Sequence, residues 1–189
     1  MSDDGSVVVL GDHGGVYLKV VDSHTGDETV SLSMLGRRVR SCAIDLARGI
    51  LVSGSHNGEL TVWDLGSGVE LRKMRGHTGC VKSCRINCDG TRLVSTSDDC
   101  SAKVWSLDNG SLISSLDGHE GPVLGCGFSA DKGMVFSVSQ DCTLCVWNIE
   151  TGAILSKFRA RGPLHSCAAD AETVLVTGWH GVYRLTLVP

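Results

Sequence analysis

The sequence repeats itself at an interval of about 42 residues. One column of the repeat holds four cysteines with spacings of 42, 42 and 41 residues, namely Cys42, Cys84, Cys126 and Cys167. A second column, also at an interval of 42 residues, holds Trp63, Trp105 and Trp147. A period of this length indicates that one supersecondary unit stacks on copies of itself. The repeat therefore favours a solenoid or a propeller over a single irregular core.

Each period contains four short apolar segments separated by turn residues. The period that begins near residue 80 reads "CVKSCRIN", "TRLVSTS", "SAKVWSL" and "SLISSL", with "CDG", "SDD" and "DNG" between them. Short runs rich in Val, Leu and Ile between Gly, Asn and Asp are typical of β-strands. A helical solenoid would need long amphipathic segments, which the sequence lacks. We therefore predict an all-β chain whose four-stranded antiparallel blades stack around an axis as a β-propeller.

The period divides the chain into one propeller segment with incomplete blades at both ends. The predicted units are a partial blade over residues 1–35, blades over 36–75, 76–117 and 118–160, and a partial blade over 161–189. The opening "SDDGS" matches the turn "NCDGT" that follows the first strand of a full blade, so the first unit lacks that strand. We expect the units to hold three, four, four, four and three strands.

Two units carry a Gly-His pair, an Asp and a Trp at matching intervals. Asp99 follows His77 by 22 residues and Trp105 follows Asp99 by 6, and the next unit repeats both intervals with His119, Asp141 and Trp147. With these motifs the chain resembles the WD-repeat β-propeller proteins over nearly its whole length. It is more loosely similar to the C-terminal propellers of apoptotic protease-activating and NACHT-type signalling ATPases. The last unit departs from the pattern, because it lacks both the His and the Trp.

The number of periods is small for this family. The chain holds about 4.5 periods, whereas proteins of the family usually close with about seven blades. An open stack would expose apolar blade faces and unpaired strand edges. The resemblance therefore implies that these residues are part of a larger ring. Closure with another chain and a distorted five-bladed ring are the alternatives.

The resemblance also implies a buried hydrogen-bonded network in the two strongest units. It would join the loop His, a strand hydroxyl, the turn Asp and the indole N–H, using His77, Ser95 or Ser97, Asp99 and Trp105, and then His119, Ser137 or Ser139, Asp141 and Trp147. Ser, His and Asp also form hydrolase triads. The trio recurs once per unit, however, and no GxSxG nucleophile elbow accompanies it. We therefore predict structural braces and no enzyme activity.

Composition and cysteine content restrict the remaining classes. A formal charge of -4 and a pI of about 5.9 argue against sequence-independent binding of nucleic acid. No basic leader with an apolar stretch and no run of about 20 apolar residues occurs, so we expect no membrane association. Nine cysteines, an odd number, favour a reducing compartment without disulfides. We expect a cytoplasmic protein, with a nuclear location as the alternative, and neither a metal nor a cofactor.

The resemblance implies a non-enzymatic scaffold or recognition module, within a larger signalling or regulatory protein, that binds proteins or peptides through its loops. A substrate receptor of a ubiquitin ligase and an RNA-associated WD-repeat protein are the alternatives. Further propeller blades, from the same or another chain, are a second class of partner. The residues expected at the binding surface are Arg37, Arg38, Arg40, His56, Lys82, Arg159, Arg161 and Trp179. The arginines could bind an acidic or phosphorylated peptide or be ordinary solvated surface, and Trp179 could anchor a partner or cap its own blade.

Overall fold

The computed structural model describes residues 6–11, 17–33, 38–129, 133–169 and 173–186. The regular structure of these residues is entirely β-strand, and none of it is a helix able to cross a membrane. The strands, in chain order, are β1 (Val7–Gly11), β2 (Tyr17–Asp22), β3 (Glu28–Ser33), β4 (Val39–Asp45), β5 (Ile50–Ser55), β6 (Leu60–Asp64), β7 (Glu70–Met74), β8 (Val81–Ile86), β9 (Arg92–Ser97), β10 (Ser101–Ser106), β11 (Leu112–Asp117), β12 (Val123–Phe128), β13 (Met134–Ser139), β14 (Thr143–Asn148), β15 (Ile154–Arg159), β16 (Leu164–Ala169), β17 (Thr173–Gly178) and β18 (Gly181–Thr186).

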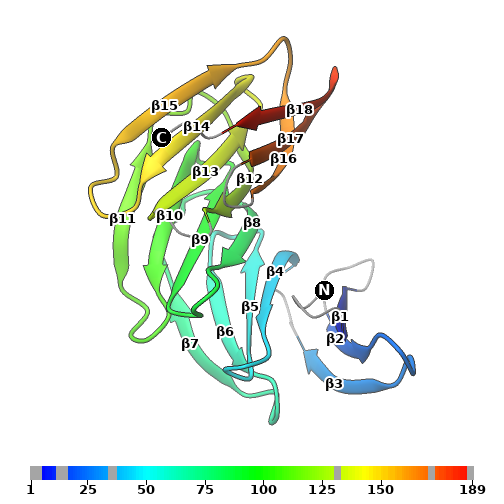
Figure 1. Cartoon of the computed structure of the whole chain (residues 1–189). Helices are drawn as coiled ribbons and strands as arrows, with labels where there is room; N and C mark the ends of the chain where they lie inside the picture. Colours follow the sequence, from blue (N-terminus) through cyan, green and yellow to red (C-terminus); the bar gives the residue numbers. More distant parts are fainter. Residues whose placement is uncertain (1–5, 12–16, 34–37, 130–132, 170–172, 187–189) are drawn as a thin grey trace.

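The strands form five antiparallel sheets, each a meander of consecutive strands. Strands β1–β3 make the first sheet, β4–β7, β8–β11 and β12–β15 make the next three, and β16–β18 make the last. The sheets follow one another along an arc, with β7, β11 and β15 on its outer side and β4, β8 and β12 on its inner side (Figure 1). The predicted all-β class and the stack of propeller blades, about four and a half of them, are confirmed.

A recurrent glycine allows the tight turn between the third and fourth strands of the three four-stranded sheets. Gly68, Gly110 and Gly152 stand at this turn, 42 residues apart, with φ of 69°, 77° and 68°. A left-handed φ is strained for residues with a Cβ and costs glycine nothing. The sequence period is therefore also a period of backbone conformation.

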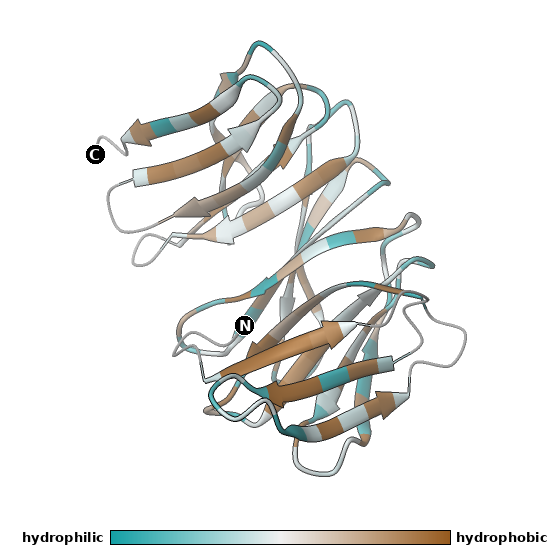
Figure 2. Ribbon diagram, turned by 90° about the vertical axis from the view of Figure 1, so that its right-hand side faces the viewer, coloured by the Kyte–Doolittle hydropathy of each residue, from teal (hydrophilic) through white to brown (hydrophobic). Residues whose placement is uncertain are grey.

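The hydrophobic core lies between consecutive sheets and not within one central interior. Trp105 of β10 belongs to one buried cluster with Val52 and Leu60 of the preceding sheet, and Trp147 of β14 belongs to a cluster with residues of the third sheet. Figure 2 shows hydrophobic residues concentrated on the strands and hydrophilic residues in the turns. Each sheet is thus stabilised mainly by its neighbours, as expected for a repeat protein.

The inner strands β4, β8, β12 and β16 lie next to one another. At one end of the sheets, the turn after each second strand meets the segment that leads into the inner strand. The backbone N–H groups of the turn donate to that segment, in the bonds His56 to Arg38, Asp98 to Cys80, Gln140 to Pro122 and Trp179 to Pro163, at 3.0–3.1 Å. We call this end, formed by these turns and segments, the upper face.

Candidate functional site

The His77 network occupies the third sheet, directly below the upper face. The indole Nε1–H of Trp105 donates to Ser95 Oγ at 2.8 Å, and Ser95 Oγ lies 2.8 Å from His77 Nε2. On the other side of the ring, His77 Nδ1 lies 2.8 Å from Asp99 Oδ2. Ser101 Oγ donates to the second carboxylate oxygen at 2.7 Å. Donors and acceptors match throughout if the imidazole is neutral and carries its proton on Nδ1.

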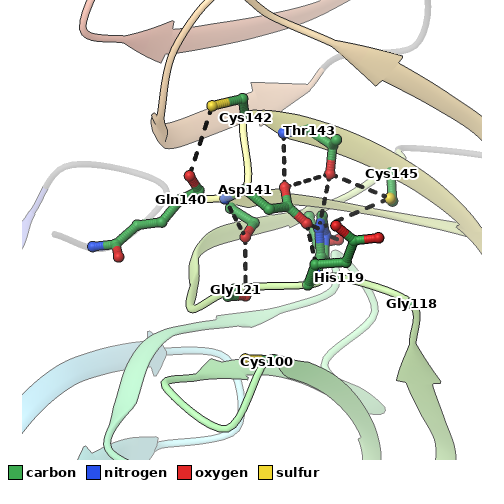
Figure 3. Close-up of polar contacts among 12 residues, drawn as sticks. Cys100, Gly118, His119, Gly121, Gln140, Asp141, Cys142, Thr143 and Cys145 are labelled. Atoms are coloured by element: carbon green, nitrogen blue, oxygen red, sulfur yellow. Dashed lines mark hydrogen bonds and ion pairs between the residues drawn. The ribbon is translucent and has the colours of Figure 1, made fainter.

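The fourth sheet repeats the network with nearly the same geometry, and Figure 3 shows the part around His119, Asp141 and Thr143. His119 Nδ1 lies 3.0 Å from Asp141 Oδ2, and its Nε2 lies 2.7 Å from Ser137 Oγ. Trp147 Nε1–H donates to the same hydroxyl at 2.7 Å. Thr143 Oγ1 replaces the serine hydroxyl and donates to Asp141 Oδ1 at 2.6 Å. Two copies with the same bonds indicate a repeated structural unit.

Burial and hydrogen bonding fix the protonation of both networks. Burial lowers the pKa of His77 and His119, and the neighbouring carboxylates oppose this effect only in part, so both imidazoles are neutral near pH 7. Burial alone would raise the pKa of Asp99 and Asp141. Hydrogen bonds from the Ser101 or Thr143 hydroxyl, the imidazole and a backbone N–H outweigh it and hold each pKa at about 2.

The structure resolves which serine joins each imidazole. Ser95 and Ser137 bond the imidazole and the indole. Ser97 and Ser139 lie two residues further along the same strands and accept the backbone N–H of Asp99 and Asp141, at 3.1 Å in both cases. The sequence reasoning missed the hydroxyls of Ser101 and Thr143. A Ser or Thr stands two residues after the turn Asp in both repeats, and this pattern could have identified the two hydroxyls from the sequence.

The triad geometry does not give access to a substrate. The Ser95 and Ser137 side chains are fully buried, and the indole N–H donates a hydrogen bond to the hydroxyl oxygen that would have to attack a substrate. A nucleophilic hydroxyl must reach a substrate carbonyl and have oxyanion donors beside it. These two trios can therefore hold the strands together but cannot present a nucleophile.

The other sheets keep only part of the network. In the second sheet Trp63 Nε1–H donates to Ser53 Oγ at 2.9 Å, and Asn57 stands at the turn position of Asp99. In the last sheet Val176 occupies the position of Ser95, since it pairs with Cys167 as Ser95 pairs with Cys84. The bracing weakens towards both ends of the arc.

The turn after the bracing Asp holds a strained cysteine in two sheets. Cys100 and Cys142 have φ of 68° and 70°, whereas the second sheet carries Gly58 there, with φ of 82°. Replacing Cys142 with glycine is expected to raise the free energy of unfolding by about 0.5–1 kcal/mol, because glycine adopts this φ without strain. Gly58→Ala should instead cost about 2 kcal/mol, since a Cβ there would lie 2.5 Å from His77 O. Urea denaturation of both variants measures these changes. A Cys142→Gly variant that is less stable than the wild type would show that the backbone of Cys142 is not strained.

The upper face brings together most of the residues proposed to bind partners. Arg38, Arg40, His56 and Trp179 are exposed on it. Arg159, the last residue of β15, and Arg161, on the connection from β15 to β16, are exposed, and this connection leads to the same face. Arg37 lies outside the described residues.

Two side-chain pairs on the upper face were not predicted from the sequence. Lys82 Nζ lies 2.9 Å from Asp98 Oδ2, so the charge of Lys82 is compensated within its own sheet. His165, which stands on β16 where β8 carries Lys82, places its ring 6.4 Å from that of Trp179, at an angle of 36°. In both sheets a residue of the second-to-third strand turn contacts the second residue of the inner strand. Lys82 and His165 stand at the same position of the repeat, two residues before the inner-strand cysteine, so the sequence alone showed that they are equivalent.

The cysteine column lies on the inner strands. Cys84, Cys126 and Cys167 are buried and Cys42 is half-buried, and all nine cysteines are free thiols. Burial raises the pKa of Cys84 to about 12 and that of Cys126 to about 11. These thiols stay protonated and pack as small apolar side chains. Among the described residues, no group of three or more His, Cys, Asp and Glu side chains could hold a metal ion.

Comparison with known proteins agrees with the repeat and the sheets. The family model described as "WD domain, G-beta repeat" matches residues 68–106 and 110–148. The computationally designed Ika8 protein shares 28% identity with 96% of this chain at a TM-score of 0.82, and the match spans 56% of the Ika8 chain. The designed Ika4 protein shares 28% identity at a TM-score of 0.77, over 87% of this chain and 100% of Ika4.

No curated protein gave a significant match, so the narrower resemblance to signalling ATPases stays a prediction. The chain spans little more than half the length of Ika8. The matched repeats contain Trp105, Trp147 and both bracing aspartates. Together with the antiparallel blades and the two His-Ser-Trp-Asp networks, these matches show that residues 68–106 and 110–148 are WD40 repeats and that the chain has the fold of a WD40-type β-propeller.

Proposed function

We propose that the chain is a non-enzymatic recognition module that binds a protein or peptide segment on the upper face. The observation that carries this proposal is Trp179, whose side chain is 74% exposed beside His165. Tryptophan is enriched at the energetic centres of protein interfaces. It has a large apolar surface that is rarely left in contact with water.

The other residues of the upper face would orient the partner segment. Arg38 and Arg40 lie on the second sheet and Trp179 on the last, with the compensated Lys82 and Asp98 pair between them. Exposed guanidinium groups suit a carboxylate or phosphate on the partner. The partner segment would thus place an apolar side chain on Trp179 and an acidic group near the arginines.

A displayed peptide library selected on the protein tests this proposal. Trp179→Ala should weaken binding of the selected peptides at least tenfold, because the anchor is lost, and should leave the melting temperature unchanged. Leu155→Ala is the matched control, since Leu155 is 54% exposed but lies on the outer strand β15. Equal affinity for the Trp179→Ala variant, or equal losses in both variants, would refute the anchor.

A second partner is proposed for the open side of the last sheet. Leu175 pairs with the residue that follows the inner-strand cysteine, and Val52, Val94 and Phe136 hold the same position in the three preceding sheets. Those three side chains are fully buried by the next sheet, whereas Leu175 is 46% exposed. Val182 on β18 is 69% exposed. Further propeller sheets, from a longer parent protein or another chain, would cover this apolar surface. Such a parent would be a cytoplasmic signalling or regulatory protein. Light scattering of a Leu175→Asp variant at several concentrations would show whether association through this face occurs.

A further inference from the structure

The outer strands β7 and β11 each tie their sheet to the next one through a side-chain donor. Arg72 of β7 donates from Nη1 to Leu107 O at 2.7 Å, and Ser114 of β11 donates from Oγ to Ile149 O at 2.8 Å. The two donors stand 42 residues apart, as do the two acceptors. Leu107 and Ile149 are buried, with 3% and 4% of their surface exposed. The contact is therefore part of the repeat and covers the accepting residue.

The interface between the first and second sheets lacks this donor. One period earlier, the two positions hold Val30 of β3 and Leu65. Val30 has the same place as Arg72, because it lies against the turn glycine Gly68 as Arg72 lies against Gly110. A valine side chain cannot donate a hydrogen bond, so the carbonyl of Leu65 receives no equivalent bond. Leu65 is also only half-buried.

A pocket of about 380 Å³ opens at this interface. The first sheet contributes Val7, Val20 and Val30 to its wall, and the second unit contributes Leu46 and Leu65. No charged side chain of the described residues lines it. Sites for small molecules are typically pockets of roughly 300–1,000 Å³ with apolar walls and a few polar groups. The missing donor thus coincides with a space of the size and character of a ligand site.

The polar groups around the pocket can accept hydrogen bonds, but their donors are already in use. Thr29 Oγ1 donates to Val20 O at 3.0 Å. The backbone N–H of Gly49 donates to Leu46 O at 3.2 Å, and that of Leu65 donates to Gly49 O at 2.8 Å. The Leu65 carbonyl and the Thr29 hydroxyl oxygen keep lone pairs for a ligand. A ligand that fits this pattern is neutral and carries a donor.

We propose that this pocket binds a small neutral aromatic molecule with one N–H or O–H donor, of the indole or phenol class. The aliphatic wall would take the ring, and the donor would bond Leu65 O, as Arg72 and Ser114 bond the equivalent carbonyls. The volume suits one or two fused rings, since a cavity of roughly 150 Å³ is enough for benzene. Leu46 and Leu65 follow the ends of β4 and β6, away from the upper face, so the site is separate from the proposed function.

Titration of protein labelled at its Val and Leu methyl groups, followed by NMR, tests this site. The probes are indole and N-methylindole, which has the same rings but no donor. Indole should cause saturable shifts at the methyl groups of Val20, Val30 and Leu65. N-methylindole should bind the same site about two- to tenfold more weakly, because one hydrogen bond is lost. Equal affinities for the two probes, saturable shifts confined to other methyl groups, or no saturable shift would overturn the inference.

Two variants of Val30 separate the volume of the pocket from its polar chemistry. Val30→Arg would fill the space and donate to Leu65 O, so it should raise the dissociation constant of both probes by at least about tenfold. Val30→Thr changes the volume little and supplies a hydroxyl, as Ser114 does, so indole should then bind no better than N-methylindole. Leu112→Arg is the matched control, since it adds the same side chain at a position of β11 that is 46% exposed and outside the pocket. Unchanged indole binding in both Val30 variants would contradict the assignment, and Val30→Thr tests it even if Val30→Arg does not fold.

Discussion

Replacing Asp141 with alanine is expected to lower the free energy of unfolding by about 3–5 kcal/mol. The carboxylate accepts the imidazole N–H of His119, the Thr143 hydroxyl and the backbone N–H groups of Glu120 and Thr143, at 2.6–3.0 Å. Alanine would leave these donors without an acceptor. The imidazole and the threonine hydroxyl are buried, where an unsatisfied polar group is costly.

The second sheet provides the matched control for this prediction. Asn57 stands at the same turn position, but it is exposed and, within the part of the chain that the structure describes, accepts only the Ser55 hydroxyl and the Glu59 N–H. Asn57→Ala should therefore cost less than about 1 kcal/mol. Urea denaturation followed by tryptophan fluorescence measures both variants. Similar losses at positions 57 and 141 would show that the network adds nothing to an ordinary turn.

Acid is expected to destabilise the protein in two stages, with little change between pH 7 and pH 8. His77 and His119 have lowered pKa values in the folded state, so the unfolded state binds more protons below about pH 6.5 and stability falls there. Asp99 and Asp141 have a folded pKa of about 2 against 3.8. Each carboxylate contributes on the order of 2 kcal/mol that is lost as the pH falls from about 5 towards 2.

Chemical denaturation at a series of pH values measures this profile. The sign is the same for both residue types, because protonation of either breaks the arrangement of a neutral imidazole and an ionised carboxylate. The Asp141→Ala variant should show a shallower acid loss than the wild type, since one pair is already broken. A protein that gains stability between pH 6.5 and pH 5 would contradict the neutral state of the histidines.

The repeat predicted the sheets well because its signals are local. Trp105, Asp99 and His77 recur at fixed intervals, and a fixed interval places a residue at the same point of each blade. The partial sheets at the two ends followed from the same alignment. The choice between Ser95 and Ser97 could not be made in this way. Both lie on one face of β9, and only the position of the indole and imidazole shows which hydroxyl joins them.

Contacts between a turn and an inner strand were also beyond the sequence. The pairing of Lys82 with Asp98 and the contact of His165 with Trp179 join residues 16 and 14 positions apart, whose approach depends on how the turn folds back on the inner strand. Such relations are tertiary, and a one-dimensional pattern carries no direct signal of them.

Recognition of a peptide on the upper face is tested most directly by hydrogen exchange, measured by mass spectrometry with and without a peptide selected on the wild-type protein. Binding there should slow exchange in residues 54–58 and 177–181, which contain His56 and Trp179, and leave the outer strands β7, β11 and β15 unchanged. Slower exchange confined to the outer strands, or none in either turn, would contradict the account.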